Sequence, residues 1–227
     1  MSLRPDAWLS DVLGFRVFAT GPDGETPSSA ERSLTYAKVP VEATEEVLAL
    51  TARGFAVVDV NVTLTLRALS ALDDSSVVDV APARSEHREA LSDIAGSCFR
   101  YSRFHLDPLI PNELAHRVKR EWVMSYLGGH RGVELLVAVD RDKPIGFLAV
   151  IATGNARVID LVGVSPNAQR KGVGTALVTA FVERHAPVAE ELRVGTQIAN
   201  VPSLRLYERL GFSVTSAAYV LHLHKGL

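Results

Sequence analysis

The feature that most constrains the fold is a glycine-bearing bend at residues 164–174, between a predicted strand and a predicted helix. Gly172 and Gly174 let the backbone approach a ligand closely, and the free N–H groups of a first helical turn favour an anion such as a pyrophosphate. Arg170 and Lys171 add positive charge to the bend. Glycines at turns are more often only turn formers, so the bend alone does not establish a binding site.

The pattern around the bend predicts an α/β (α+β) fold with a mixed, twisted sheet. Helices are expected where apolar residues recur at three- and four-residue spacing, and strands where they alternate or run together. From residue 77 the predicted order is strand 77–81, helix 85–99, loop 100–111, helix 112–127, strands 134–139, 145–151 and 157–164, helix 172–185, strand 192–198, helix 201–210 and strand 217–223.

The beginning of the chain repeats the order found at its end. The predicted elements there are strand 35–41, helix 44–52, a stop at Gly54-Phe55 and strand 56–66. Thr44 would cap the helix, and Gly211-Phe212 matches the stop in the later copy. We infer a degenerate half-domain at residues 1–72 before a complete domain at 73–227, with the boundary among the small and acidic residues 68–76. Because strand-helix-strand is a common order, chance repetition stays open.

Composition limits the partners that we expect. Hydrophobic residues make up 47% of the 227 residues, which is enough for a core, and 22% are charged. With a net charge of −2, a nucleic acid is not an expected partner. The single Cys98 suits a reducing cytoplasm. The longest apolar stretch, residues 145–152, is too short to span a bilayer, so we expect a cytoplasmic protein without a membrane partner.

A second motif, from Asn200 to Phe212, predicts a helix with a tyrosine inside it. Asn200 with Pro202 in the first turn is typical of a helix start, and Gly211 ends the helix. Asn200 is either a helix cap or a coenzyme contact. Tyr207 is either a core aromatic or a catalytic residue.

The two motifs together resemble the GCN5-related N-acetyltransferase (GNAT) family. Gln169-x-x-Gly172-x-Gly174 after a Val-x-Pro strand end is similar to that family's acetyl-CoA signature, and the element order from Val77 onward is similar to its fold. The resemblance implies acetyl-CoA as cosubstrate, no metal, and a small-molecule amine as acceptor. The coenzyme contacts that it implies are Val162, Val164, Gln169, Arg170, Lys171, Gly172, Val173, Gly174, Thr175, Asn200 and Arg205.

The resemblance also implies that Tyr207 protonates the departing thiolate. A phenol has a pKa near 10 and a thiol one near 8.5, so a phenol in reach can donate as charge develops on sulfur. For the base, strand alternation places Asp160 on one face with Val162 and Val164, among apolar neighbours that would raise its pKa. Alternatively Asp160 faces solvent and water carries the proton.

Within the family, the chain is similar to members that acetylate an aminodeoxy sugar on a nucleotide. The half-domain, the loop Ser102-Arg103-Phe104 and the run 192–200 carry this likeness. The chain departs from those relatives at Leu206, where they have a coenzyme-binding arginine. In this sequence the nearest arginine is the preceding residue, Arg205. Loop residues would bind the acceptor: Tyr101, Arg103 and His105, with Arg103 facing a phosphate.

Other acceptors and another class of protein stay open. A protein N-terminus, an antibiotic or a polyamine could be acetylated, or the chain could sense acyl-CoA without turnover. Tyr207 argues against a sensor. The first copy has Leu50 at the matching place, so that half would instead shape the acceptor pocket or a homodimer contact.

Overall fold

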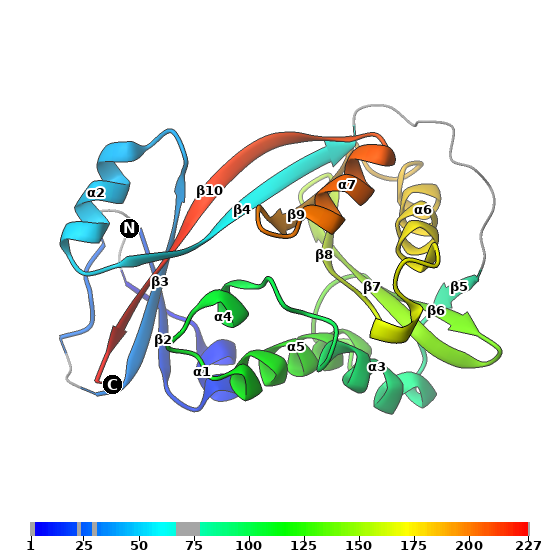
Figure 1. The fold of residues 1–227 in the computed structure, drawn as a ribbon, viewed down its shortest axis with the longest axis horizontal. Coiled ribbons are helices and arrows are strands. Elements are labelled where there is room, and N and C mark those ends of the chain that lie inside the picture. The colour runs from blue at the N-terminus through cyan, green and yellow to red at the C-terminus, as the bar shows by residue number, and fades with distance from the viewer. Residues whose placement is uncertain (1–2, 22–23, 29–30, 67–77, 227) are drawn as a thin grey trace.

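The computed structural model describes residues 3–21, 24–28, 31–66 and 78–226, and these form one ten-stranded mixed sheet with helices on both faces (Figure 1). The strand order is β1-β2-β3-β10-β4-β9-β8-β7-β6-β5. The strands are β1 Arg4–Pro5, β2 Arg16–Thr20, β3 Ser33–Pro40, β4 Ala56–Leu66, β5 Asp79–Pro82, β6 Glu134–Asp140, β7 Lys143–Thr153, β8 Ala156–Val164, β9 Glu191–Gln197 and β10 Phe212–Lys225. The helices are α1 Ala7–Leu13, α2 Thr44–Ala52, α3 Arg88–Ala95, α4 Arg103–Leu106, α5 Asn112–Leu127, α6 Val173–His185 and α7 Val201–Arg209, with 3₁₀ turns at Ser85–His87 and Pro166–Ala168.

Two apolar cores lie on opposite faces of the second half of the sheet. On one face α6 and α7 pack through Leu177, Phe181 and Tyr207. On the other face α3 and α5 pack through Leu91 and Val123. The sheet is therefore buried on both sides where β6 to β9 run, which fits the near-continuous apolar runs of these strands.

The sheet opens between β8 and β9. Their parallel pairing runs only from Ala156 with Glu191 to Ile159 with Val194. Beyond that point β8 continues against β7 as far as Val164, while β9 is held by β4. Because each strand offers peptide groups to both of its edges, the ends of β8 and β9 present backbone donors and acceptors to the gap.

The repeat inferred from the sequence reappears in the element bounds. Helices α2 and α7 have nine residues each and begin 157 positions apart, at Thr44 and Val201. In β3 and β10, residue 40 pairs with residue 218, and in β9 and β4, residue 197 pairs with residue 61, which is the same register after the 157-residue shift. The four strands β3-β10-β4-β9 thus have an approximate two-fold arrangement. The predicted boundary at 68–76 lies almost wholly in the undescribed residues 67–77, so the division into domains stays a prediction.

The structure departs from the predicted elements at a few places. The helix expected at 85–99 ends at Ala95, and α4 forms inside the expected loop. Helix α1 was not predicted, although Asp6 caps it through the Leu9 amide at 3.0 Å and Gly14 ends it at φ 79°. Thr44 is the first residue of α2, and the cap position before it has no side-chain hydrogen bond. None of the described helices is long and apolar enough to cross a membrane.

Candidate active site

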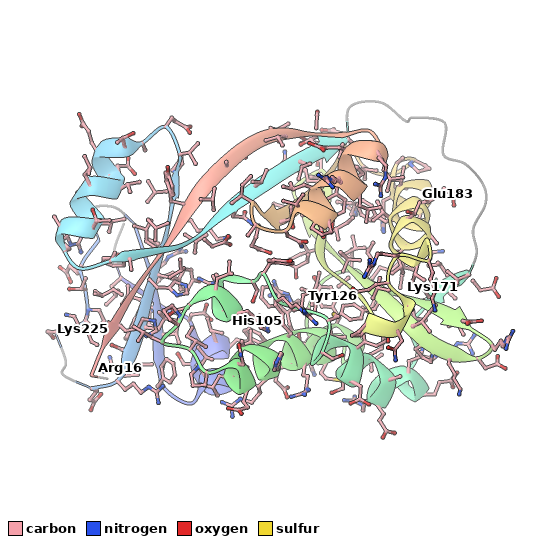
Figure 2. The ribbon with its side chains drawn as sticks, viewed as in Figure 1. Arg16, His105, Tyr126, Lys171, Glu183 and Lys225 are labelled. Atoms are coloured by element: carbon pink, nitrogen blue, oxygen red, sulfur yellow. The ribbon has the colours of Figure 1, made fainter. Side chains whose placement is uncertain are left out.

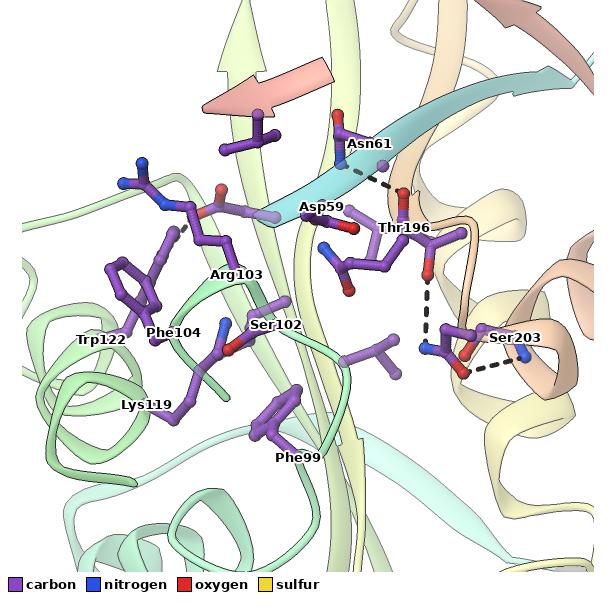
Figure 3. A pocket seen from close by; sticks show the side chains of 18 of the residues that line it. Asp59, Asn61, Phe99, Ser102, Arg103, Phe104, Lys119, Trp122, Thr196 and Ser203 are labelled. Atoms are coloured by element: carbon purple, nitrogen blue, oxygen red, sulfur yellow. Dashed lines mark hydrogen bonds between the residues drawn. The ribbon is translucent and has the colours of Figure 1, made fainter. Parts of the chain in front are cut away.

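A cavity of about 250 Å³ lies where β8 and β9 separate (Figure 3). Its walls come from β8 and β9, from α7, from the early strands β3 and β4, and from α5 with the loop before α4. This volume is at or below the lower end for small-ligand pockets, about 300 Å³. The cavity is therefore too small to enclose a drug-sized ligand completely.

Tyr207 reaches this cavity from α7. Its side chain is only 1% exposed, and its ring packs against Phe212 at a centroid distance of 6.0 Å. The hydroxyl makes no hydrogen bond with the residues that the structure describes. Burial raises the pKa of Tyr207, which keeps the phenol protonated and able to donate.

Asn200 both caps α7 and lines the cavity. Its Oδ1 accepts a long hydrogen bond from the Ser203 amide at 3.4 Å, and its Nδ2 lies 3.3 Å from Thr196 Oγ1. The capping interpretation is therefore confirmed. Contact of Asn200 with a coenzyme stays a prediction.

The glycine-bearing bend adopts the conformation that an anion site needs. Gly172 takes φ 83° just before α6, and Arg170 also has a positive φ of 62°. Gln169 donates from Nε2 to the Val164 carbonyl at 3.2 Å, which ties the bend to the end of β8. No side chain caps α6, so the N–H groups of its first turn are free to bind an anion. Arg170 and Lys171 are exposed, and Figure 2 shows Lys171 near the start of α6.

The other predicted coenzyme residues occupy different environments. Val162 lines the cavity, while Val164 is half-buried beyond it. Val173 is buried in the core, and Thr175 is half-buried on α6. A Cβ on Gly174 would lie 3.3 Å from Leu206, so the first turn of α6 packs closely on α7.

Arg205 is exposed on α7 and does not line the cavity. Its neighbour Leu206 is the residue that meets Gly174. The two side chains therefore point in different directions, as expected for consecutive helical residues.

Asp160 does not share a face with Val162 and Val164, contrary to the alternation argument. The pairing of β7 with β8 shifts by one residue between Leu161 and Ile159, which leaves Asp160 as the extra residue of a β-bulge. Ile159 then packs with α6, and Leu161 with α3 and α5. The bulge turns Asp160 toward α5.

The surroundings of Asp160 also differ from the expected apolar ones. Its Oδ2 accepts hydrogen bonds from Trp122 at 2.8 Å, Tyr126 at 2.6 Å and Arg131 at 2.8 Å. Burial alone would raise its pKa, but these donors outweigh it, so the pKa is lowered rather than raised. The expected pKa shift was wrong, and a carboxylate held in this way is a poor base.

Asp59 on β4 is a second carboxylate in the cavity, and the sequence argument missed it. It is 6% exposed, and its Oδ1 has no hydrogen-bond partner among the described residues. Burial raises the pKa of Asp59 to about 6. Its signal in the sequence is weak, because Asp59 is one of several polar residues in β4, flanked by Val58 and Val60.

The three predicted acceptor residues do not lie together. Arg103 lines the cavity, with its guanidinium over the rings of Tyr36 and Phe104 at 3.9 and 4.7 Å. Tyr101 and His105 are not among the lining residues. Tyr101 is 38% exposed, and the ring nitrogens of His105 lie 2.6 Å from Ser102 Oγ and 3.2 Å from His116 Nδ1.

A buried clamp joins the end of α4 to β10. Asp107 Oδ2 lies 2.6 Å from His222 Nδ1 and 2.7 Å from His224 Nε2, and Oδ1 accepts from the Leu109 amide at 2.9 Å. Each of these three side chains offers one ligand atom of a type that binds metal ions, and the three atoms lie within 4.8 Å of one another. At these distances the hydrogen bonds already account for the cluster. The clamp fixes the segment that carries Arg103.

Comparison with known proteins identifies the class. The model of the acetyltransferase (GNAT) family matches residues 89–212, more than half of the chain. The chain therefore belongs to this family, as the two sequence motifs indicated.

Two relatives have names that refer to a polysaccharide or to a nucleotide sugar. The chain is 27% identical over 230 residues to a dTDP-fucosamine acetyltransferase of Escherichia coli, covering 97% of both chains. It is 29% identical over 151 residues to the spore coat polysaccharide biosynthesis protein SpsD of Bacillus subtilis. That match covers 65% of this chain and 51% of SpsD, so the chain spans about half the length of this relative.

Solved structures share the fold at low identity. A GCN5-related N-acetyltransferase from Sphaerobacter thermophilus superposes with a TM-score of 0.61 at 16% identity, covering 88% of this chain and 62% of that one. A functionally unknown protein from Staphylococcus epidermidis gives a TM-score of 0.63 at 17% identity, covering 92% and 84%. These likenesses confirm the GNAT fold and its mixed sheet.

Proposed function

We propose that this protein transfers the acetyl group of acetyl-CoA to a primary amine of a small molecule, preferably an aminodeoxy sugar carried on a nucleotide. The observation that carries the proposal is the cavity between the parting strands β8 and β9, which holds a protonated phenol and a buried carboxylate with one oxygen atom that has no hydrogen-bond partner among the described residues. Membership of the acetyltransferase family supports the reaction class.

The bend at residues 169–174 would hold the coenzyme pyrophosphate. The uncapped first turn of α6 and the positive φ of Gly172 suit close approach of an anion, and Arg170 and Lys171 add charge. Backbone N–H groups of β8 beyond Ile159 would meet the thioester carbonyl and stabilise the oxyanion. Asn200 and Val162 line the cavity and would flank the coenzyme arm.

Direct attack requires an acid for sulfur and a base for nitrogen. The neutral acceptor nitrogen bonds to the thioester carbon, the carbon–sulfur bond breaks, and Tyr207 gives its proton to the thiolate. The second proton, which nitrogen loses as the amide forms, would restore the Tyr207 phenol. Asp59 would take the proton of the acceptor ammonium, because its pKa of about 6 leaves it ionised at neutral pH. Asp160 would instead hold Trp122 and Tyr126 in place beside the acceptor site.

The acceptor class rests on the named relatives and on the early strands. The dTDP-fucosamine acetyltransferase covers nearly the whole chain, including residues before the family match. Lys38, Asp59 and Asn61, which line the cavity, come from that early part. The half-domain inferred from the sequence would thus serve the acceptor, and Arg103 would be the loop residue that meets it.

An acceptor panel tests the proposal. Release of CoA thiol is followed with acetyl-CoA and an amino-sugar nucleotide, an aminoglycoside, a polyamine or a peptide. We expect turnover with the amino-sugar nucleotide and not with the aminoglycoside, the polyamine or the peptide. Turnover of the peptide alone would contradict the acceptor class, and no turnover with any amine despite acetyl-CoA binding would favour a sensor.

A further inference from the structure

The cavity carries more positive than negative charge. Its lining includes the cations Lys38, Arg103 and Lys119 and the carboxylates Asp59 and Asp160. Asp160 is already paired with a cation outside the lining, the Arg131 side chain at 2.8 Å. The remaining lining groups are three cations and one carboxylate, so the acceptor end of the cavity attracts anions.

Lys119 is the most unusual of these groups. It projects from α5 and is 6% exposed, with its ammonium 4.8 Å from the ring centroids of both Phe99 and Trp122 (Figure 3). It makes no hydrogen bond or ion pair with any residue in the described ranges. Ring faces compensate only part of the cost of burying a charge, so an anion beside this ammonium would be strongly favoured.

Arg103, which also lines the cavity, supplies a second buried donor. Its Nη1 is buried without a hydrogen-bond partner among the described residues. The guanidinium carbon lies 3.9 Å from the ring centroid of Tyr36 and 4.7 Å from that of Phe104, and these contacts restrict where the guanidinium can move. A buried guanidinium with a free donor is suited to oxygen atoms of a phosphate.

We propose that Arg103 and Lys119 form an anion subsite that binds a phosphate group of the acceptor. This inference rests on the proposed function and deepens it, since it selects anionic amines over the polycationic polyamines and aminoglycosides. The subsite is separate from the coenzyme bend, because no residue of 169–174 lines the cavity. Asp59 lies across the cavity from Lys119, which places the amine and the phosphate at different walls (Figure 3).

The subsite is tested by binding, without turnover. Inorganic pyrophosphate is titrated by calorimetry into the protein saturated with CoA, so that the bend is already filled. We expect the wild type to bind pyrophosphate, and Lys119→Met and Arg103→Met each to weaken binding at least tenfold. Lys143→Met, an exposed lysine on β7, is the matched control and should leave it unchanged.

Two further sets of measurements distinguish a failure of the subsite from a failure of the proposed function. Thermal melting and CoA affinity, measured for every variant, show that each is folded with an intact coenzyme site. Among acceptors, kcat/KM should rise at least tenfold from a free aminodeoxy sugar to its 1-phosphate, and Lys119→Met should remove most of that rise. Absence of pyrophosphate binding by the wild type, or equal binding by Lys119→Met, would overturn the subsite. Pyrophosphate binding without acetylation of any amine would instead overturn the proposed function.

Discussion

Asp59 and Asp160 lie beside the same cavity, yet their surroundings give them opposite pKa shifts. Asp59 is buried with one oxygen unpaired, so its pKa is raised to about 6. Asp160 accepts three hydrogen bonds at one oxygen, and its pKa is lowered. The base is therefore better assigned to Asp59, although only Asp160 stood out in the sequence.

Replacing Asp59 by Asn should remove the acid limb of the pH profile. A base must be deprotonated to act, so wild-type kcat/KM should fall as pH drops through about 6. Asp59→Asn should lower kcat/KM by about 10²–10⁴ at pH 7.5 and flatten that limb. Asp160→Asn is the comparison, and it should retain a limb near pH 6 even if its stability falls. A wild-type limb that survives in Asp59→Asn would assign the base elsewhere.

Removing the Tyr207 hydroxyl should affect turnover more than binding. Tyr207→Phe keeps the ring that packs on Phe212, so the fold should be preserved. We expect kcat to fall at least about tenfold while the Kd for acetyl-CoA changes little, measured by steady-state kinetics and calorimetry. Unchanged kcat would leave Tyr207 as a core aromatic.

At the scale of elements, the sequence predicted the features that depend on residues close together in the chain. Helices α2 and α5 lie at the predicted residues, and the bend before α6 has the glycine conformation that its sequence indicated. Lys119 was not predicted to line the site, although its position in the sequence is unusual. It lies on the apolar face of α5 with Ala115, Val118 and Trp122. An isolated lysine at such a position indicates a buried charge with a special role.

The bulge at Asp160 could not be predicted from the strand itself. Alternation along 157–164 requires an unbroken strand, but one extra residue at the bulge reverses the faces on either side of it. The shift is set by pairing with β7, which is a tertiary interaction. The position of Asp59 in the cavity could not be predicted for the same reason, because it depends on the pairing of β4 with β9 in the folded sheet.

Replacing Gly172 by Ala tests the bend. At φ 83° a Cβ costs about 1 kcal/mol, and it should also disturb the backbone that meets the pyrophosphate. Gly154→Ala is the matched control, with φ 56° and open space around its Cβ. Both variants should lose similar stability in urea unfolding, but only Gly172→Ala should raise the Kd for acetyl-CoA, by about threefold or more. Equal effects of the two variants on that Kd would show that the bend does not bind the coenzyme.

At the scale of the whole molecule, the first and last strands form one structure. β10 lies between β3 and β4, so the early residues complete the sheet on which α7 and its Tyr207 pack. The clamp of Asp107 with His222 and His224 then joins the acceptor loop to β10. The sequence predicted the repeated order but not this interleaving, which depends on pairing between strands more than 140 positions apart.

The clamp should make stability depend on pH. Burial lowers the pKa of His222 to about 4, below its ordinary value near 6.5. Between these values the unfolded chain binds more protons than the folded one, so the free energy of unfolding should fall on acidification from pH 6.5 to 4. We expect His222→Gln to reduce this loss by about 1–3 kcal/mol in urea unfolding at both pH values. An identical pH dependence in the variant would contradict the assignment.

The central claim is that one coenzyme site, at the bend before α6, serves the cavity beside Tyr207. Calorimetric titration of acetyl-CoA into the folded protein tests this most directly. Because the first copy has Leu50 in place of Tyr207, we predict saturable binding of one acetyl-CoA per chain, weakened by Gly172→Ala. A folded protein that binds no acetyl-CoA would contradict the claim.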